Sequence, residues 1–124
     1  MVILQTGRCA VCVEITLHFQ FAYATSDLAH THLASGPYGY SKAAEPFDQA
    51  VGQWASTLEP KPLLVTARSL VADALSCGYT GLVLLHGMLS SGVAGEWAPM
   101  HQPFALEHPT YYGMMVSGFE RQPQ

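Results

Sequence analysis

Charged side chains are scarce in this sequence. The chain has 124 residues, of which five are Lys or Arg and nine are Asp or Glu, so that only 11% carry a charge. An average soluble domain carries about 25%. A surface with so few charges is largely neutral or apolar, and such surfaces promote association. We therefore expect a homo-oligomer, or a subunit that binds another protein.

Basic residues are too few and too dispersed for a nucleic-acid site. They are Arg8, Lys42, Lys61, Arg68 and Arg121. Because a protein that follows a phosphate backbone needs clustered cations, we expect no nucleic-acid partner.

The first residues lack a basic region followed by an apolar stretch and a cleavage site, so we expect no signal peptide and a cytoplasmic or virion location. No apolar run approaches the ~20 residues that span a bilayer, so we expect no membrane partner.

The three cysteines are too few and unevenly spaced for the disulfide framework of a secreted protein, which favours a reducing compartment. Cys9 and Cys12 form a Cys-x-x-Cys pair, which can serve as half a zinc site or as a redox dithiol. His30 and His32 would complete it, and the chain would then be a zinc-stabilised adaptor. The alternative is that no cofactor binds and the cysteines are small apolar side chains, because side chains three apart on a strand point to opposite faces.

The strongest local pattern is an alternation of apolar and mostly polar residues over 11–23. A period of two predicts a strand with one packed face, in a largely antiparallel sheet. At ~3.3 Å per residue it would extend about 43 Å, longer than a typical strand. We expect such a strand to overhang its domain and to pair with another subunit.

Two helices are predicted after a Gly- and Tyr-rich loop. Apolar residues recur at helical spacing from Pro46 to Leu58 and again from Leu63 to Cys77, with Gly78 placed to end the second helix. The short run Leu82–Leu85 predicts a buried strand, 90–109 a loop, and 111–119 a last strand. A chain of this length builds one core. We expect a single α+β domain over 1–124, with a mostly antiparallel sheet containing one long strand, packed against a two-helix hairpin.

The segment from Leu82 to Gly92, with His86 and Gly87 after the apolar run, resembles the His-Gly oxyanion-hole segment of α/β-hydrolases. That resemblance implies a backbone N–H that stabilises an oxyanion. No Gly-x-Ser-x-Gly motif follows, and Ser117 lacks the preceding glycine. We interpret the segment as a strand that runs into a turn, and we assign no catalytic residue.

Six histidines allow another function. His30 and His32 would lie on the same side of an extended segment, where imidazoles can bind a metal or transfer a proton. No carboxylate has a spacing that forces it beside them. Together with His86 and His101 they would line a pocket, so the alternative is a small-molecule-binding protein or a small enzyme.

Aromatic side chains crowd the loops and the first strand, and amphipathic rings are typical of interfaces. The candidate interface residues are Phe19, Phe21, Tyr23, Tyr38, Tyr40, Trp97, Tyr111 and Tyr112. The order of a strand at 9–24, a helical hairpin at 46–77 and a strand at 111–119 resembles that of phage tail-terminator and tail-completion proteins. The resemblance implies a ring-forming structural subunit without catalytic residues. A non-enzymatic assembly subunit is therefore the function that the sequence favours.

Overall fold

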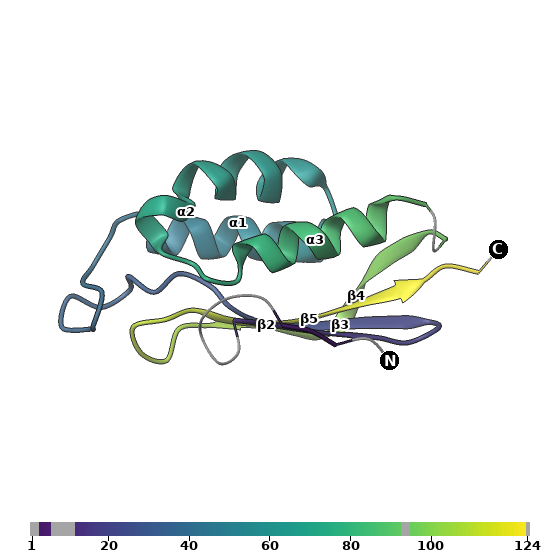
Figure 1. Cartoon of the computed structure of the whole chain (residues 1–124), viewed down its shortest axis with the longest axis horizontal. Helices are drawn as coiled ribbons and strands as arrows, with labels where there is room; N and C mark the ends of the chain where they lie inside the picture. Colours follow the sequence, from purple (N-terminus) through teal and green to yellow (C-terminus); the bar gives the residue numbers. More distant parts are fainter. Residues whose placement is uncertain (1–2, 6–11, 93–94, 124) are drawn as a thin grey trace.

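The protein is an α+β fold in which helices cover one face of an antiparallel sheet (Figure 1). The structure is a computed structural model and describes residues 3–5, 12–92 and 95–123. Its elements are β1 (Ile3–Gln5), β2 (Val13–Leu17), β3 (Phe21–Asp27), α1 (Ala44–Thr57), η1 (Pro62–Ala67), α2 (Arg68–Ala74), α3 (Tyr79–Ser90), β4 (Trp97–Glu107) and β5 (Met114–Arg121). The predicted α+β class and the antiparallel sheet are confirmed.

The sheet has the strand order β1-β2-β3-β5-β4, and every pair is antiparallel. The prediction of a single strand over 11–23 is wrong, because β2 and β3 form a hairpin. A hydrogen bond from the His18 N–H to the Phe21 carbonyl, at 2.7 Å, closes the turn between them. Leu17 pairs with Ala22, so buried positions change from odd to even numbers across the turn. The overhang expected from a long strand is therefore also absent from the described residues.

The longest strand, β4, forms in the segment predicted as a loop. It lies at the edge of the sheet and contains Pro99 and Pro103, with a register shift between Pro99 and Phe104. Proline has no N–H to donate to a neighbouring strand, so it is tolerated at an edge. These prolines leave this edge poorly suited to pairing with another strand.

The predicted helical hairpin is confirmed. Helix α1 buries Phe47, Val51 and Trp54 on one stripe and packs against η1 and α2, which follow each other without a break. The second helix ends at Ala74 with Leu75 in the left-handed region at φ 56°, not at Gly78.

A third helix replaces a predicted strand. Leu82–Leu85 lies within α3, where Leu82, Leu85 and Leu89 are buried at helical spacing. Gly78 precedes this helix, and a Cβ there would collide with the backbone oxygens of Asp27 and Cys12. The glycine therefore lets the α2–α3 connection approach the ends of β2 and β3.

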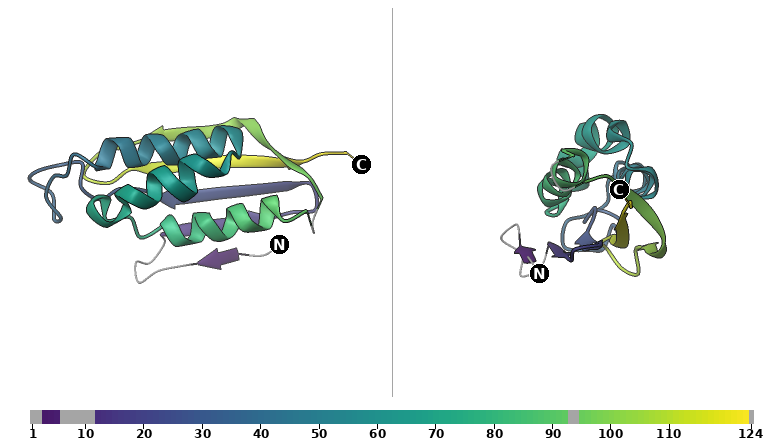
Figure 2. Two further views of the ribbon diagram at one scale, coloured as in Figure 1. Left: turned by 90° about the horizontal axis from the view of Figure 1, so that it is seen from above. Right: turned by 90° about the vertical axis from the view of Figure 1, so that its right-hand side faces the viewer.

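The opposite face of the sheet is not covered by any described helix, as the end view in Figure 2 shows. The helix-facing positions of β3 are the buried Ala22 and Ala24, so the rings of Phe21 and Tyr23 lie on the open face, with centroids 6.1 Å apart. Across the described residues, we find no helix with the length and hydropathy needed to cross a bilayer.

Candidate metal centre

The segment 28–32, which follows β3, is held between the β4–β5 loop and the end of α2. The Leu28 N–H bonds to the Gly113 carbonyl at 2.7 Å, and the Gly113 N–H bonds to the Ala29 carbonyl at 2.8 Å. The His30 N–H bonds to the Ala74 carbonyl at 2.8 Å. These bonds fix the backbone from which the side chains of His30 and His32 project.

His32 is paired with a buried carboxylate. Its Nε2 lies 2.6 Å from Oδ2 of Asp48, and the side chains are 4% and 6% exposed. The other carboxylate oxygen accepts the Ala29 N–H at 2.9 Å. An ionised carboxylate only accepts hydrogen bonds, so the proton of a neutral His32 resides on Nε2 and the Nδ1 lone pair is left free.

Burial raises the pKa of Asp48, and the hydrogen bonds from Ala29 and His32 oppose this rise. Asp48 also depends on a close approach of the β4–β5 loop, because a Cβ on Gly113 would overlap its carboxylate. Any larger residue at position 113 would therefore displace the Asp48 carboxylate that pairs with His32.

Two further side chains reach the same place. The ring of His108, from the β4–β5 loop, stacks on that of His32 with centroids 4.2 Å apart and planes inclined by 1°. Its Nε2 lies 3.5 Å from Oε2 of Glu45, in the first turn of α1. His32, Glu45 and His108 can each offer one ligand atom such that all three atoms lie within 4.8 Å of one another.

These donors lie beside a hollow of about 360 Å³. It is lined by Glu45, Asp48, Gln49, Leu106, Glu107 and His108. Two imidazoles and one carboxylate are donors that Zn²⁺ accepts, and such sets of three occur in zinc sites that keep a fourth position open. By contrast, the hydrogen bonds of the described residues give His32 no hydroxyl or thiol partner, so the pair lacks a nucleophile.

The structure divides the zinc set predicted from the sequence. Cys9 lies outside the described residues, and Cys12 forms a disulfide with Cys77. His32 pairs with Asp48, whereas His30 stacks on Tyr38 and lies with Asp27 and Cys77 in another group of potential ligands. The prediction of one site with these four ligands is therefore wrong for its described members, and so is the expectation that Cys12 is an unpaired apolar side chain.

Within the part of the chain that the structure describes, the four histidines of the predicted pocket do not come together either. His86 lies in α3, where its Nδ1 accepts a hydrogen bond from Nε1 of Trp54 at 2.9 Å, and His101 is exposed on β4. Burial lowers the pKa of His86. Because His86 and Gly87 occupy the interior of a helix, the expected resemblance to an oxyanion-hole segment has no structural counterpart.

The predicted interface aromatics fall in separate places. Tyr38, Tyr111 and Tyr112 surround the ring of His30, with centroids 5.5, 6.1 and 6.4 Å away. Phe21 and Tyr23 lie on the open sheet face, Tyr40 is exposed in the loop before α1, and Trp97 is half-buried against the core. Phe19 and Trp97 line one hollow together with Arg121. Phe19, in the β2–β3 turn, also borders a second hollow together with the C-terminal strand.

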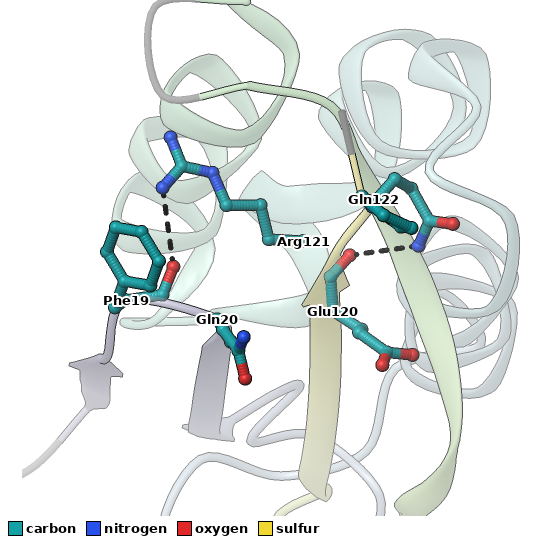
Figure 3. A pocket seen from close by; sticks show the side chains of 6 residues that line it. Phe19, Gln20, Glu120, Arg121 and Gln122 are labelled. Carbon is teal, nitrogen blue, oxygen red and sulfur yellow. Dashed lines mark hydrogen bonds between the residues drawn. The ribbon is translucent and has the colours of Figure 1, made fainter.

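That hollow, of about 560 Å³, lies at the end of the sheet where Phe21 pairs with Glu120, whereas His32 follows the other end of β3. Figure 3 shows Phe19, Arg121 and Gln122 among the residues that line it. Arg121 lines this hollow and contacts Phe19 twice. Its guanidinium lies 5.1 Å from the centroid of the Phe19 ring, and Nη1 donates to the Phe19 carbonyl at 3.4 Å. Phe19 is 80% exposed, and the remaining polar groups there are Gln20, Glu120 and Gln122. One cation already engaged with the protein and one carboxylate do not form a convergent set, so we favour the histidine cluster.

Sequence reasoning missed Glu45, Asp48 and His108 as members of one cluster. One signal was present: Asp48 lies beside the apolar stripe of α1, next to Phe47 and three residues before Val51. A carboxylate on a buried helix face needs a partner. The pattern does not say which residue that partner is.

Comparisons with known proteins add no family. No protein-family model matches the chain, and a search of curated proteins found no match. The geometry of the cluster formed by His32, Glu45 and His108 is therefore the basis for a function.

Proposed function

We propose that this protein binds a divalent metal ion, with Zn²⁺ the best chemical fit, through His32, Glu45 and His108. The observation that carries the proposal is the proximity of two imidazoles and a carboxylate, with one donor atom of each within 4.8 Å of the others. Imidazole with carboxylate is a common ligand combination for zinc.

Asp48 supports this assignment because it does what an outer carboxylate does at many metal sites. Metal-ligating histidines usually donate their second ring N–H to a carboxylate or carbonyl, which fixes the tautomer and raises the basicity of the ligand nitrogen. Asp48 engages Nε2 of His32 at 2.6 Å, so Nδ1 is the nitrogen offered to the metal. The Ala29 N–H holds the carboxylate from the other side.

Three protein ligands leave room for a fourth. The site borders the hollow that Gln49, Leu106 and Glu107 also line, so a water molecule or a small anionic ligand has access to it. Structural zinc sites are usually closed by four protein ligands, whereas sites with three keep a position for water or substrate. The arrangement therefore favours a ligand-binding or hydrolytic metal site over a purely structural one.

Equilibrium binding of Co²⁺ and Zn²⁺ to the oxidised protein tests the proposal. His108 is half exposed, so the His108→Gln variant should fold normally and lose most of its metal affinity. His101→Gln is the matched control, because His101 is an exposed histidine on β4 outside the cluster. Equal affinities for the wild type and both variants would overturn the assignment.

A second candidate is the assembly subunit expected from the sequence, and the uncovered sheet face favours it. Phe21 and Tyr23 stack on that face, and Met114, which is 42% exposed, lies farther along it on β5, where it pairs with Asp27. The small number of charges supports burial of this face against a second copy. Such an assembly would fit a cytoplasmic or virion-associated structural role.

Sedimentation velocity separates this candidate from a monomer. If copies associate through the open face, Tyr23→Lys should shift the protein toward the monomer, whereas Tyr40→Lys in the exposed loop should not. A monomeric wild type, or equal effects of both substitutions, would refute it.

A further inference from the structure

A second cluster of metal-binding groups lies on the other side of segment 28–32. The Cys12–Cys77 disulfide joins the residue before β2 to the connection between α2 and α3. Asp27, at the end of β3, and His30 complete the cluster. One donor atom from each of Asp27, His30 and Cys77 can be chosen so that the three lie within 4.8 Å of one another.

The surrounding backbone holds these groups together independently of the disulfide. The Asp27 N–H bonds to the Cys12 carbonyl at 2.8 Å, and the His30 N–H bonds to the Ala74 carbonyl at 2.8 Å, three residues before Cys77. Gly78 packs directly against the backbone of Asp27 and Cys12. The segments that carry the four side chains therefore remain connected when the sulfur–sulfur bond opens.

The cluster is partly shielded from water. Cys12 is 1% exposed and His30 is 8% exposed, and three tyrosine rings surround the imidazole, whereas Asp27 and Cys77 are half-buried. A buried imidazole beside two sulfur atoms and a carboxylate resembles, in its donor chemistry, the mixed nitrogen and sulfur sets that bind zinc tetrahedrally. In the oxidised protein the sulfur atoms are bonded to each other and cannot act as thiolate ligands.

We propose that reduction of the Cys12–Cys77 disulfide creates a thiolate zinc site formed by Cys12, Cys77, His30 and Asp27. A dithiol reductant transfers two electrons and two protons to the disulfide, which gives two cysteine thiols and the cyclic disulfide of the reductant. Zn²⁺ then displaces one proton from each thiol and binds the two thiolates together with an imidazole nitrogen and a carboxylate oxygen. The chain would thus exchange a covalent link for a metal link, depending on the redox state.

This site does not depend on the site proposed above. The first cluster uses His32, Glu45 and His108 and contains no sulfur, so its affinity should not depend on the redox state. The two proposals therefore fail separately: the first in the oxidised protein, and the second only in the reduced protein.

Co²⁺ titration of the full chain, followed by absorbance, tests the inference. A Cys9→Ser background leaves Cys12 and Cys77 as the only thiols, and a phosphine reductant opens the disulfide without itself supplying a thiol. We expect the reduced protein to bind one further equivalent of Co²⁺ and to show thiolate-to-cobalt charge-transfer absorption in the near ultraviolet. Both signals should be absent from the oxidised protein and from Cys77→Ser.

Alkylation provides a second measurement that does not depend on cobalt absorbance. In the reduced Cys9→Ser protein, Zn²⁺ should slow the reaction of both thiols with iodoacetamide by about tenfold or more, because a metal-bound thiolate is a poorer nucleophile. His101→Gln should not alter this protection, whereas His30→Gln should reduce it. A reduced protein with two titratable thiols, no additional cobalt and no protection by zinc would overturn the inference.

Discussion

Replacing Asp48 tests the centre of the candidate site, because this carboxylate makes two buried hydrogen bonds. It accepts the Ala29 N–H at 2.9 Å and lies 2.6 Å from Nε2 of His32. A hydrogen bond to a charged group contributes about 1.5–3 kcal/mol, and an unpaired buried donor costs about 1–3 kcal/mol. Asp48→Ala should therefore lower the free energy of unfolding by about 3–5 kcal/mol.

Asp48→Asn separates the role in stability from the role in metal binding. The amide oxygen can still accept the Ala29 N–H, so the loss of stability should be only about 1–2 kcal/mol. The amide N–H₂ would instead donate to Nε2 of His32, which moves the ring proton to Nδ1 and blocks the ligand atom. We expect Zn²⁺ affinity to fall by about 10- to 100-fold in a folded protein.

Urea unfolding followed by tryptophan fluorescence measures the first effect, and competition with a chromophoric chelator measures the second. Asp73→Ala is the control, because the Asp73 side chain is exposed on α2 and should change neither quantity. A loss below about 1 kcal/mol for Asp48→Ala would refute the buried pair. An unchanged Zn²⁺ affinity in Asp48→Asn would refute the role assigned to the tautomer.

Three more outcomes follow from described contacts. Burial lowers the pKa of His86, whose Nδ1 accepts from Trp54, so the folded chain resists protonation more than the unfolded chain does. The free energy of unfolding should fall as the pH drops below about 6.5, and His86→Leu should flatten this dependence in thermal unfolding at several pH values. Gly113→Ala should displace Asp48, costing about 1–3 kcal/mol in urea unfolding and weakening Zn²⁺ binding; unchanged values would contradict the close approach. Cys77→Ser opens a link between residues 65 apart and should lower the free energy of unfolding by about 2–4 kcal/mol relative to the oxidised wild type, whereas equal stabilities would mean that the link does not form.

The sequence predicted the elements whose patterns are local and repeated. The apolar stripe of Phe47, Val51 and Trp54 predicted α1, and the two patterns separated by prolines predicted the helical hairpin. The α+β class follows from these helices and from the alternating residues near the start of the chain. Periodicity is informative here because it extends over several turns of helix.

The errors arose where a local pattern was compatible with two structures. The alternation over 11–23 continues through the turn at 18–20, so two short strands looked like one. Leu82–Leu85 is a short apolar run, and such runs do not distinguish a buried strand from part of a buried helix. Strand β4 contains two prolines, which are tolerated because it lies at the edge of the sheet, and that position is not visible in the sequence.

By itself the sequence determined α1, the helix formed by η1 and α2, the fold class, and the supply of imidazoles, thiols and carboxylates. Only the tertiary structure decided which of these side chains contact one another. Asp48 reaches His32 across 16 residues, and Cys12 reaches Cys77 across 65, because strands and helices that are distant in the chain pack against one core. Such pairings depend on the docking of whole elements, and no residue spacing in the sequence encodes them.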